Sequence, residues 1–159
     1  MSTHRLTSTA ALVVTLLFAG GIASADLSKG VIGAFHGQLV VSKAELSEGK
    51  TDKDTIAKIK SEKLSELVGT ANEDVTSWTF HYTAFLTKPG ASTLKMEFYR
   101  DGKQYAADKR LDGIDPKSAV LSGDISISED EGLAKGKTYV IKLTSDKNVV
   151  VAQTTIVMK

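Results

Sequence analysis

Cysteine is absent from the 159-residue sequence. The chain therefore forms no disulfide, offers no thiolate ligand to a metal, and has no cysteine to which a lipid could be attached. A folded domain of this kind has to rely on apolar packing alone. In an exported protein, the absence of cysteine is more typical of a bacterial envelope than of a eukaryotic secretory route.

Long apolar runs are also scarce. The run at residues 10–18 is shorter than the roughly 20 apolar residues that a membrane-spanning helix needs. Arg5 precedes this run, and the small residues 23–25 that a signal peptidase requires follow it. We therefore expect residues 1–25 to be a secretory signal peptide, in preference to a retained membrane anchor. The remaining chain, residues 26–159, is then a single exported domain in the periplasm or the medium, without a transmembrane segment.

An excess of charge of one sign is missing as well. Loss of the signal peptide would remove Arg5 and no acid, which leaves equal numbers of basic and acidic side chains. A nucleic-acid partner requires clustered basic side chains that acids do not compensate. The neutral balance therefore argues against nucleic acid as the main partner.

Sequence motifs of common enzyme classes are lacking too. There is no G-x-S-x-G turn, no glycine-rich phosphate loop and no H-E-x-x-H helix. The two histidines beyond the signal peptide, His36 and His81, fall on expected strands opposite the large apolar side chains, so we interpret both as surface residues. Zinc would need three or four converging ligands, and the sequence shows no such set. We therefore predict a protein that is not an enzyme and has no catalytic residues, with a carboxylate-based hydrolase as the less favoured alternative.

Short alternating segments dominate the sequence from residue 74 onward. In VTSWTFHYTAFL, residues 75–86, large apolar side chains recur at every second position, which is the period of a half-buried strand. Comparable runs follow at residues 93–111, 121–128, 138–145 and 148–158. The Asp101-Gly102 step divides the first of these runs and favours a tight type I′ hairpin. With a further strand around residues 35–41, the pattern predicts seven strands at the spacing of a β-sandwich.

One segment departs from this pattern. The sequence TDKDTIAKIKSEKLSELVG begins with Thr51 and Asp54 at the positions of a capping box and ends at Gly69, a residue type that often terminates helices. Its apolar residues fall within about half of the helical wheel. We therefore expect a helix over residues 52–68, inserted between the first and second strands and docked on one face.

A tyrosine spacing indicates which kind of sandwich to expect. Leu133, Gly136 and Tyr139 stand at three-residue steps directly before an alternating strand, and Trp78 lies on the second expected strand. This arrangement resembles the tyrosine corner of fibronectin type III and immunoglobulin-like domains. The resemblance implies that the phenol of Tyr139 is buried and that its hydroxyl bonds to backbone a few residues upstream, where Gly136 permits a sharp turn. It also implies a mainly β fold, a seven-stranded sandwich of this type with one inserted α-helix, but it supplies no binding residues.

Acidic side chains cluster in the loops on either side of the expected strand at residues 121–128. A calcium ion prefers six to eight oxygen ligands, and loops of a β-sandwich can gather them. The candidate metal ligands are Asp112, Asp115, Glu129 and Asp130. Their spacing lacks the alternating ladder of an EF-hand loop, so we favour a solvated loop and no cofactor. Binding of calcium or a carbohydrate by these loops is the alternative function.

Two surface features favour contacts with another protein. Tyr99 and Tyr105 face each other across the expected hairpin, away from the apolar side of their strands, as a stiffening cross-strand pair or a small exposed aromatic surface. In the last strand the alternation places Val149, Val151 and Val157 outward. This leaves an apolar edge that is open to strand addition unless the helix or the N-terminal segment covers it. We therefore predict a noncatalytic exported binding or assembly module of the cell envelope, whose partner is another protein or a second copy.

Overall fold

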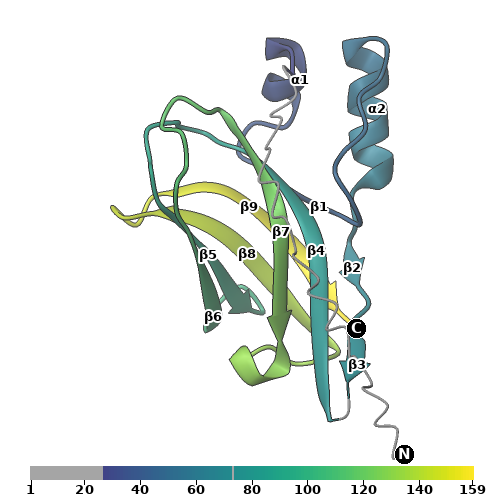
Figure 1. Cartoon of the computed structure of the whole chain (residues 1–159), viewed down its shortest axis with the longest axis vertical. Helices are drawn as coiled ribbons and strands as arrows, with labels where there is room; N and C mark the ends of the chain where they lie inside the picture. Colours follow the sequence, from purple (N-terminus) through teal and green to yellow (C-terminus); the bar gives the residue numbers. More distant parts are fainter. Residues whose placement is uncertain (1–26, 73) are drawn as a thin grey trace, which may run out of the picture.

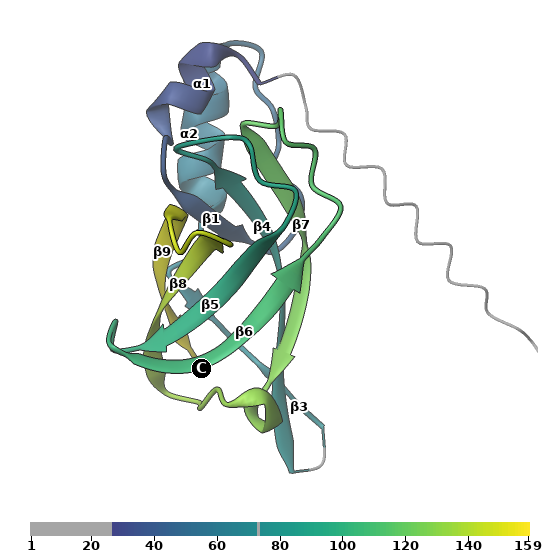
Figure 2. The ribbon, with the colours of Figure 1, turned by 90° about the vertical axis from the view of Figure 1, so that its left-hand side faces the viewer.

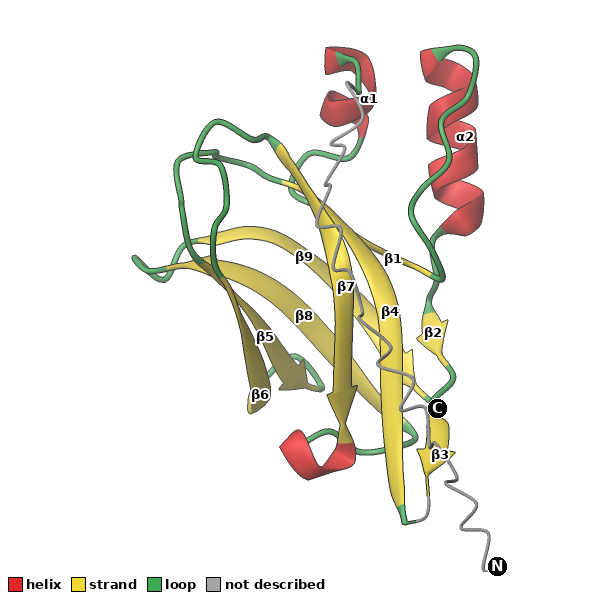
Figure 3. Cartoon of the chain, in the orientation of Figure 1, coloured by secondary structure: helices red, strands yellow, loops and turns green. Residues whose placement is uncertain are grey.

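The computed structural model describes residues 27–72 and 74–159, so the predicted signal peptide lies outside the described residues. The architecture is mainly β, with two facing sheets and a few helical segments (Figures 1 and 3). The helices are α1 (Lys29–Ala34), α2 (Asp52–Glu62) and the short 3-10 helix η1 (Glu129–Glu131). None of these described helices is long and apolar enough to cross a membrane.

Nine strands form within the described ranges, instead of the seven expected. They are β1 (Leu39–Ser42), β2 (Glu66–Leu67), β3 (Thr70–Asn72), β4 (Val75–Phe85), β5 (Leu94–Arg100), β6 (Gln104–Leu111), β7 (Val120–Ser128), β8 (Lys137–Ser145) and β9 (Val150–Met158). The difference comes from the segment after α2, which adds the short strands β2 and β3.

The two sheets share no strand. In the four-stranded sheet, β4 pairs with β7 along one edge and with β1 and then β3 along the other. The five-stranded sheet has the order β2-β9-β8-β5-β6, and all its neighbours are antiparallel except β2 and β9. Figure 2 shows β5 and β6 side by side at one margin of this sheet. Two sheets of this composition are compatible with a β-sandwich.

The main core lies between the sheets and confirms the alternation predicted for the central strands. Trp78, Phe80 and Tyr82 of β4 are buried at 0 %, 2 % and 7 % exposure. They pack with the inward side chains of β5, β7 and β8, among them Phe98 and Ile141. The indole Nε1 of Trp78 also donates a 3.1 Å hydrogen bond to the carbonyl of Lys159. Apolar burial on this scale explains how the fold manages without disulfides.

A second, smaller core lies on the outer face of the four-stranded sheet, beneath the helices. Its fully buried members are Val31 of α1, Phe35, Val40 of β1, Ile59 of α2 and Phe85 of β4. The ring centroids of Phe35 and Phe85 are 5.1 Å apart. Side chains on both faces of β4 are therefore buried near its C-terminal end, which the period of two in its sequence does not reveal.

The predicted surface position of His81 is wrong. His81 lies in the middle of β4 between Ser42 of β1 and Asp124 of β7, and it is 8 % exposed. Its Nδ1 is 2.9 Å from a carboxylate oxygen of Asp124. His36 is exposed as expected, but it lies in the turn after α1 and not on a strand. The neighbouring strands on both sides of β4 account for the burial of His81.

The helix is shorter than predicted. The Thr51 cap is confirmed, because its Oγ1 accepts a 3.2 Å hydrogen bond from the backbone N–H of Asp54. However, α2 ends at Glu62, and Lys63 is already extended. The N–H of Leu64 donates to the carbonyl of Val41 at 2.8 Å. Pairing with the sheets thus replaces the last predicted turns, and the expected helix end at Gly69 is wrong.

The hairpin and the tyrosine corner form as predicted. Asp101 and Gly102 both have positive φ, 50° and 73°, as a type I′ turn requires. Tyr139 is fully buried, and its hydroxyl accepts a 2.8 Å hydrogen bond from the N–H of Ala134, five residues upstream. Gly136 has a φ of 75°, and Leu133 is 4 % exposed. The loop between η1 and β8 is therefore fixed against the core.

Candidate binding surface

The outer face of the five-stranded sheet carries a row of side chains that crosses four strands. Tyr105 of β6 is paired in register with Tyr99 of β5. Tyr99 is in turn paired with Val140 of β8, and Val140 is paired with Thr155 of β9. We call these four residues the tyrosine row. The residues that alternate with them, such as Phe98 and Tyr139, are buried in the main core. Because successive side chains of a strand point to opposite faces, the row lies on the outside of the sandwich.

The two tyrosines form the cross-strand pair that the hairpin predicts. Their ring centroids are 5.9 Å apart with an interplanar angle of 76°, an edge-to-face arrangement. Lys142 of β8 places its Nζ 4.4 Å from the centroid of the Tyr99 ring. An edge-to-face pair and an exposed cation–π contact each contribute roughly 0.5–1 kcal/mol. Tyr99 is half-buried by these neighbours, whereas 52 % of Tyr105 remains exposed.

Carboxylates fix both tyrosine hydroxyls. The hydroxyl of Tyr99 donates to Oε2 of Glu97 at 3.3 Å, and Thr144 donates to the same oxygen at 2.9 Å. The hydroxyl of Tyr105 donates to Oδ1 of Asp108. This hydrogen bond is the main reason that the pKa of Tyr105 is raised to about 12. Burial and then Glu97 raise the pKa of Tyr99. Both phenols are therefore neutral and oriented at physiological pH.

The tyrosine row ends in a pocket of about 700 Å³. One wall is the last turn of α2 and the chain that follows it, with Lys60 and Lys63. The other wall is the sheet, with Val140 of β8 and residues 153–155 of β9. Lys60, Lys63 and Thr155 are all exposed. The pocket thus brings cationic side chains close to the edge of β9.

The three valines predicted to face outward in the last strand do not behave alike. Val149 is 45 % exposed and Val157 is half-buried, but Val151 is 4 % exposed. The register explains the error, because Leu143 pairs with Ala152 while Thr144 pairs with Val150. Val151 is therefore the extra residue of a β-bulge, which turns it inward and turns Val150 outward. The outward orientation predicted for Val151 is wrong.

The acidic residues do not come together as the calcium alternative requires. Asp112 and Asp115 precede β7, whereas Glu129 and Asp130 follow it, so the two pairs lie at opposite ends of a nine-residue strand. Within residues 27–72 and 74–159, no group of three or more His, Asp or Glu side chains is placed to hold a metal ion.

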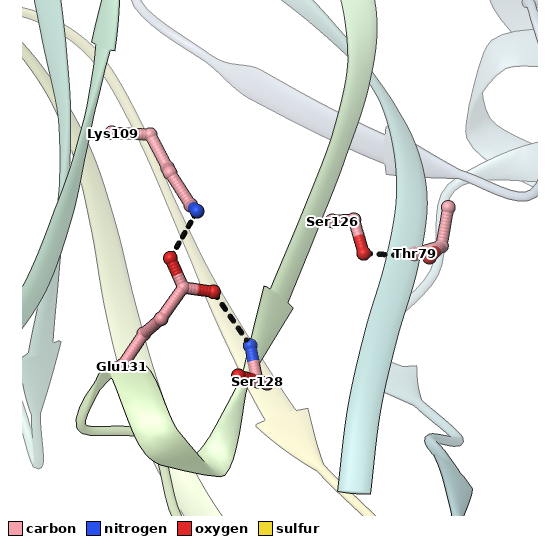
Figure 4. Close-up of polar contacts among 5 residues, drawn as sticks. All are labelled: Thr79, Lys109, Ser126, Ser128 and Glu131. Carbon is pink, nitrogen blue, oxygen red and sulfur yellow. Dashed lines mark hydrogen bonds and ion pairs between the residues drawn. The ribbon is translucent and has the colours of Figure 1, made fainter. Parts of the chain in front are cut away.

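Several acidic side chains of these loops have partners within the fold. Asp112 accepts hydrogen bonds from Arg110 at 2.8 and 2.9 Å, which lower its pKa. Glu129 accepts a 2.9 Å hydrogen bond from the N–H of Thr76, which lowers the pKa of Glu129. Glu131 bonds to Lys109 of β6 and, at 3.0 Å, to the N–H of Ser128 (Figure 4). The acidic loops therefore cap and connect the strands.

Sequence reasoning missed part of this surface. The pairing of Tyr99 and Tyr105 depends only on one hairpin, but the positions of Lys142 and Glu97 depend on the register between β5 and β8. Those strands are separated along the chain, so no local pattern reports their alignment. The pocket beside α2 was missed because the helix was expected to continue over it.

Comparison with known proteins adds no relationship by descent: no protein-family model matches this sequence, and a search of curated proteins likewise found no match.

Proposed function

We propose that this protein is a noncatalytic binding module of the bacterial cell envelope, exported to the periplasm or the medium, and that the tyrosine row is its contact surface for another protein. The observation that carries the proposal is the ordered pair of Tyr99 and Tyr105 on the outer face of the five-stranded sheet. Tyrosine is enriched where binding energy concentrates, since it provides a large contact area with few rotatable bonds. Glu97, Asp108 and Lys142 hold these rings in place before any partner arrives. Such preorganisation lowers the entropic cost of binding.

The ring geometry favours a protein over a carbohydrate. Two aromatic rings in one plane would offer a flat surface on which sugar rings could stack. The rings of Tyr99 and Tyr105 are inclined by 76°, so together they present an irregular surface with hydroxyl groups. Mixed aromatic and charged surfaces of this kind suit the side chains of a protein partner.

The strand order supports an immunoglobulin or fibronectin type III architecture for the scaffold. In these folds strands A, B and E share one sheet, whereas C, F and G share the other, which C′ can extend. Assigning β1, β4 and β7 to A, B and E, and β5, β6, β8 and β9 to C, C′, F and G, reproduces that division. The corner at Tyr139 then falls at the start of strand F, where the tyrosine corner of such domains lies. The helix α2 is an insertion after strand A.

The test is capture of the partner from an envelope extract by immobilised protein. Tyr105→Ala should weaken capture about fivefold or more, because truncating an aromatic residue that is important for binding costs over about 1 kcal/mol. Val68→Ala is the matched control, since Val68 is 77 % exposed and lies away from the row. Equal capture by Tyr105→Ala and the control, with both variants folded, contradicts the proposal.

A further inference from the structure

Other segments of the chain form hydrogen bonds with the outer edge of β9 at three places. At the second residue of the strand, the carbonyl of Val151 accepts a 2.9 Å hydrogen bond from the N–H of Thr87. Also near its start, the N–H of Gln153 donates to the carbonyl of Gly37 at 3.1 Å. Near its end, the N–H groups of Val157 and Lys159 donate to Ser65 and Leu67 at 3.0 and 2.7 Å. Gly37 lies just before β1, whereas Ser65 precedes β2 and Leu67 belongs to it. The same stretch of chain thus touches β9 before and after α2.

Between Gln153 and Val157, the insertion of α2 leaves a gap. The chain leaves β9 after Gln38 to pair with β4 as β1, passes through α2, and returns only at Ser65. No strand in the described part of the chain pairs with residues 154–156 along this edge. The gap extends over about 13 Å, four residues at the rise of a strand.

The backbone N–H and carbonyl groups of β9 at the gap point toward its outer edge. Gln153 and Val157 both direct their N–H groups to this edge. Because backbone directions alternate with a period of two, the N–H and carbonyl of Thr155 face the same way. An exposed strand edge of this kind is a template for an added strand.

The pocket beside the gap is cationic. Lys60 and Lys63 line it from the end of α2, and neither forms an ion pair within the ranges that the structure covers. Lys142 lies on the next strand, opposite Gln153. No acidic side chain lines the pocket. The surroundings of the gap therefore complement negative charge.

We propose that the gap in the β9 edge receives an extended acidic segment of a partner protein, which adds as a short strand beside Thr155 and places its carboxylates near Lys60 and Lys63. The inference rests on the proposed function, since it names the partner chemistry for the same binding module. The limited length of the gap selects a short linear segment instead of a long strand. Val140 provides an apolar contact for one side chain of that segment and joins the gap to the tyrosine row.

The experiment uses the purified protein with nitrogen-15 label and capped hexapeptides of defined sequence. The probe alternates valine with aspartate, a second peptide replaces each aspartate with lysine, and a third is the acidic peptide with N-methylated backbone. The acidic probe should shift the amide resonance of Thr155 and slow its hydrogen exchange. The N-methylated peptide should bind more weakly, because it has no N–H group to donate to the carbonyl of Thr155. The lysine peptide should bind at least about fivefold more weakly.

Two double variants distinguish binding at the pocket from general electrostatic attraction of the acidic peptide to the protein. Lys60→Gln with Lys63→Gln should weaken the acidic probe about fivefold. The control, Lys50→Gln with Lys53→Gln, makes the same change in charge near the start of α2 and should leave affinity unchanged. Equal affinity of both double variants overturns the inference, as does an unperturbed Thr155 amide. Protection of Thr155 without peptide, together with a doubled mass, also overturns it by identifying a second copy as the occupant.

Failure here is distinguishable from failure of the proposed function. If capture from the extract is lost in Tyr105→Ala but kept in the Lys60 and Lys63 double variant, the acidic segment is wrong and the binding module stands. If the probe binds at Thr155 but Tyr105→Ala captures normally, the inference stands and the tyrosine row is not the contact surface.

Discussion

The hydroxyl oxygen of Tyr139 lies 2.8 Å from the backbone nitrogen of Ala134, from which it accepts a hydrogen bond. The phenol ring is fully buried between the sheets, so this contact ties a loop to the core from inside. The bond also satisfies the backbone N–H of Ala134, a residue that lies outside the strands. Because buried donors without partners are costly, the contact stabilises the loop and the sheet packing together.

Tyr139→Phe should lower the free energy of unfolding by about 1–3 kcal/mol. The variant keeps the ring but leaves the N–H of Ala134 without its partner. Urea unfolding measures the change. Tyr105→Phe is the matched control, since it removes a hydroxyl at an exposed position and should alter stability by less than about 0.5 kcal/mol. Similar values for the two variants would show that the corner adds no stability.

Val151→Lys should destabilise the fold by at least about 3 kcal/mol, because it places an ammonium group in the apolar core. Val149→Lys, two residues earlier, should be tolerated, since Val149 is 45 % exposed. Thermal unfolding of both variants tests the bulge directly. A stable Val151→Lys variant would mean that the strand continues without the bulge.

Spectrophotometric titration should show one tyrosine with a pKa of about 12, which is Tyr105 beside Asp108. Asp108→Asn removes the carboxylate that accepts the phenol proton, so the pKa of Tyr105 should fall toward the ordinary value of 10.0. NMR titration of the ring resonances of Tyr105 assigns this pKa to the residue. No fall in its pKa in Asp108→Asn would contradict the hydrogen bond that orients this ring.

Acidic pH should destabilise the protein through the contacts of Glu131 in η1. Hydrogen bonding from Lys109 lowers the folded-state pKa of Glu131 below its usual 4.5. A carboxyl whose pKa is lowered by folding stabilises the protein above its unfolded pKa, and this contribution disappears as pH falls through the folded value. Melting temperature should therefore drop below about pH 4.5, and the drop should be smaller in Glu131→Gln. An identical pH profile in that variant would exclude the Lys109 contact as a cause.

The sequence predicts the interior of this fold better than its margins. Alternation correctly places Trp78, Phe98 and Ile141 inward, because regular strands flanked by two partners keep a strict period of two. The same rule fails at Val151, where one extra residue reverses the alternation. Alternation also does not report the burial of His81, which lies on the face opposite Phe80 and Tyr82 and is covered by neighbours from distant parts of the chain.

The candidate site divides in a similar way. Tyr99 and Tyr105 meet because three residues, 101–103, connect Arg100 to its register partner Gln104. A two-residue loop of Asp101 and Gly102 would instead place Tyr99 opposite Gln104, so the dipeptide predicts the turn but not this register. The end of α2 and the pocket behind it depend on the hydrogen bond between Leu64 and Val41, which joins segments more than twenty residues apart. Helix propensity alone favours several further residues and cannot indicate that competing bond.

The separate apolar cluster beneath α1 and α2 has a consequence for cooperativity. Because the helices pack on a cluster of five buried residues that is separate from the main core, they can detach as a local unit while the contacts between the sheets persist. The single tryptophan lies between the sheets and would not register such an event by its fluorescence. Helical circular dichroism would register it, so the two signals should diverge early in denaturation, with the ellipticity changing first.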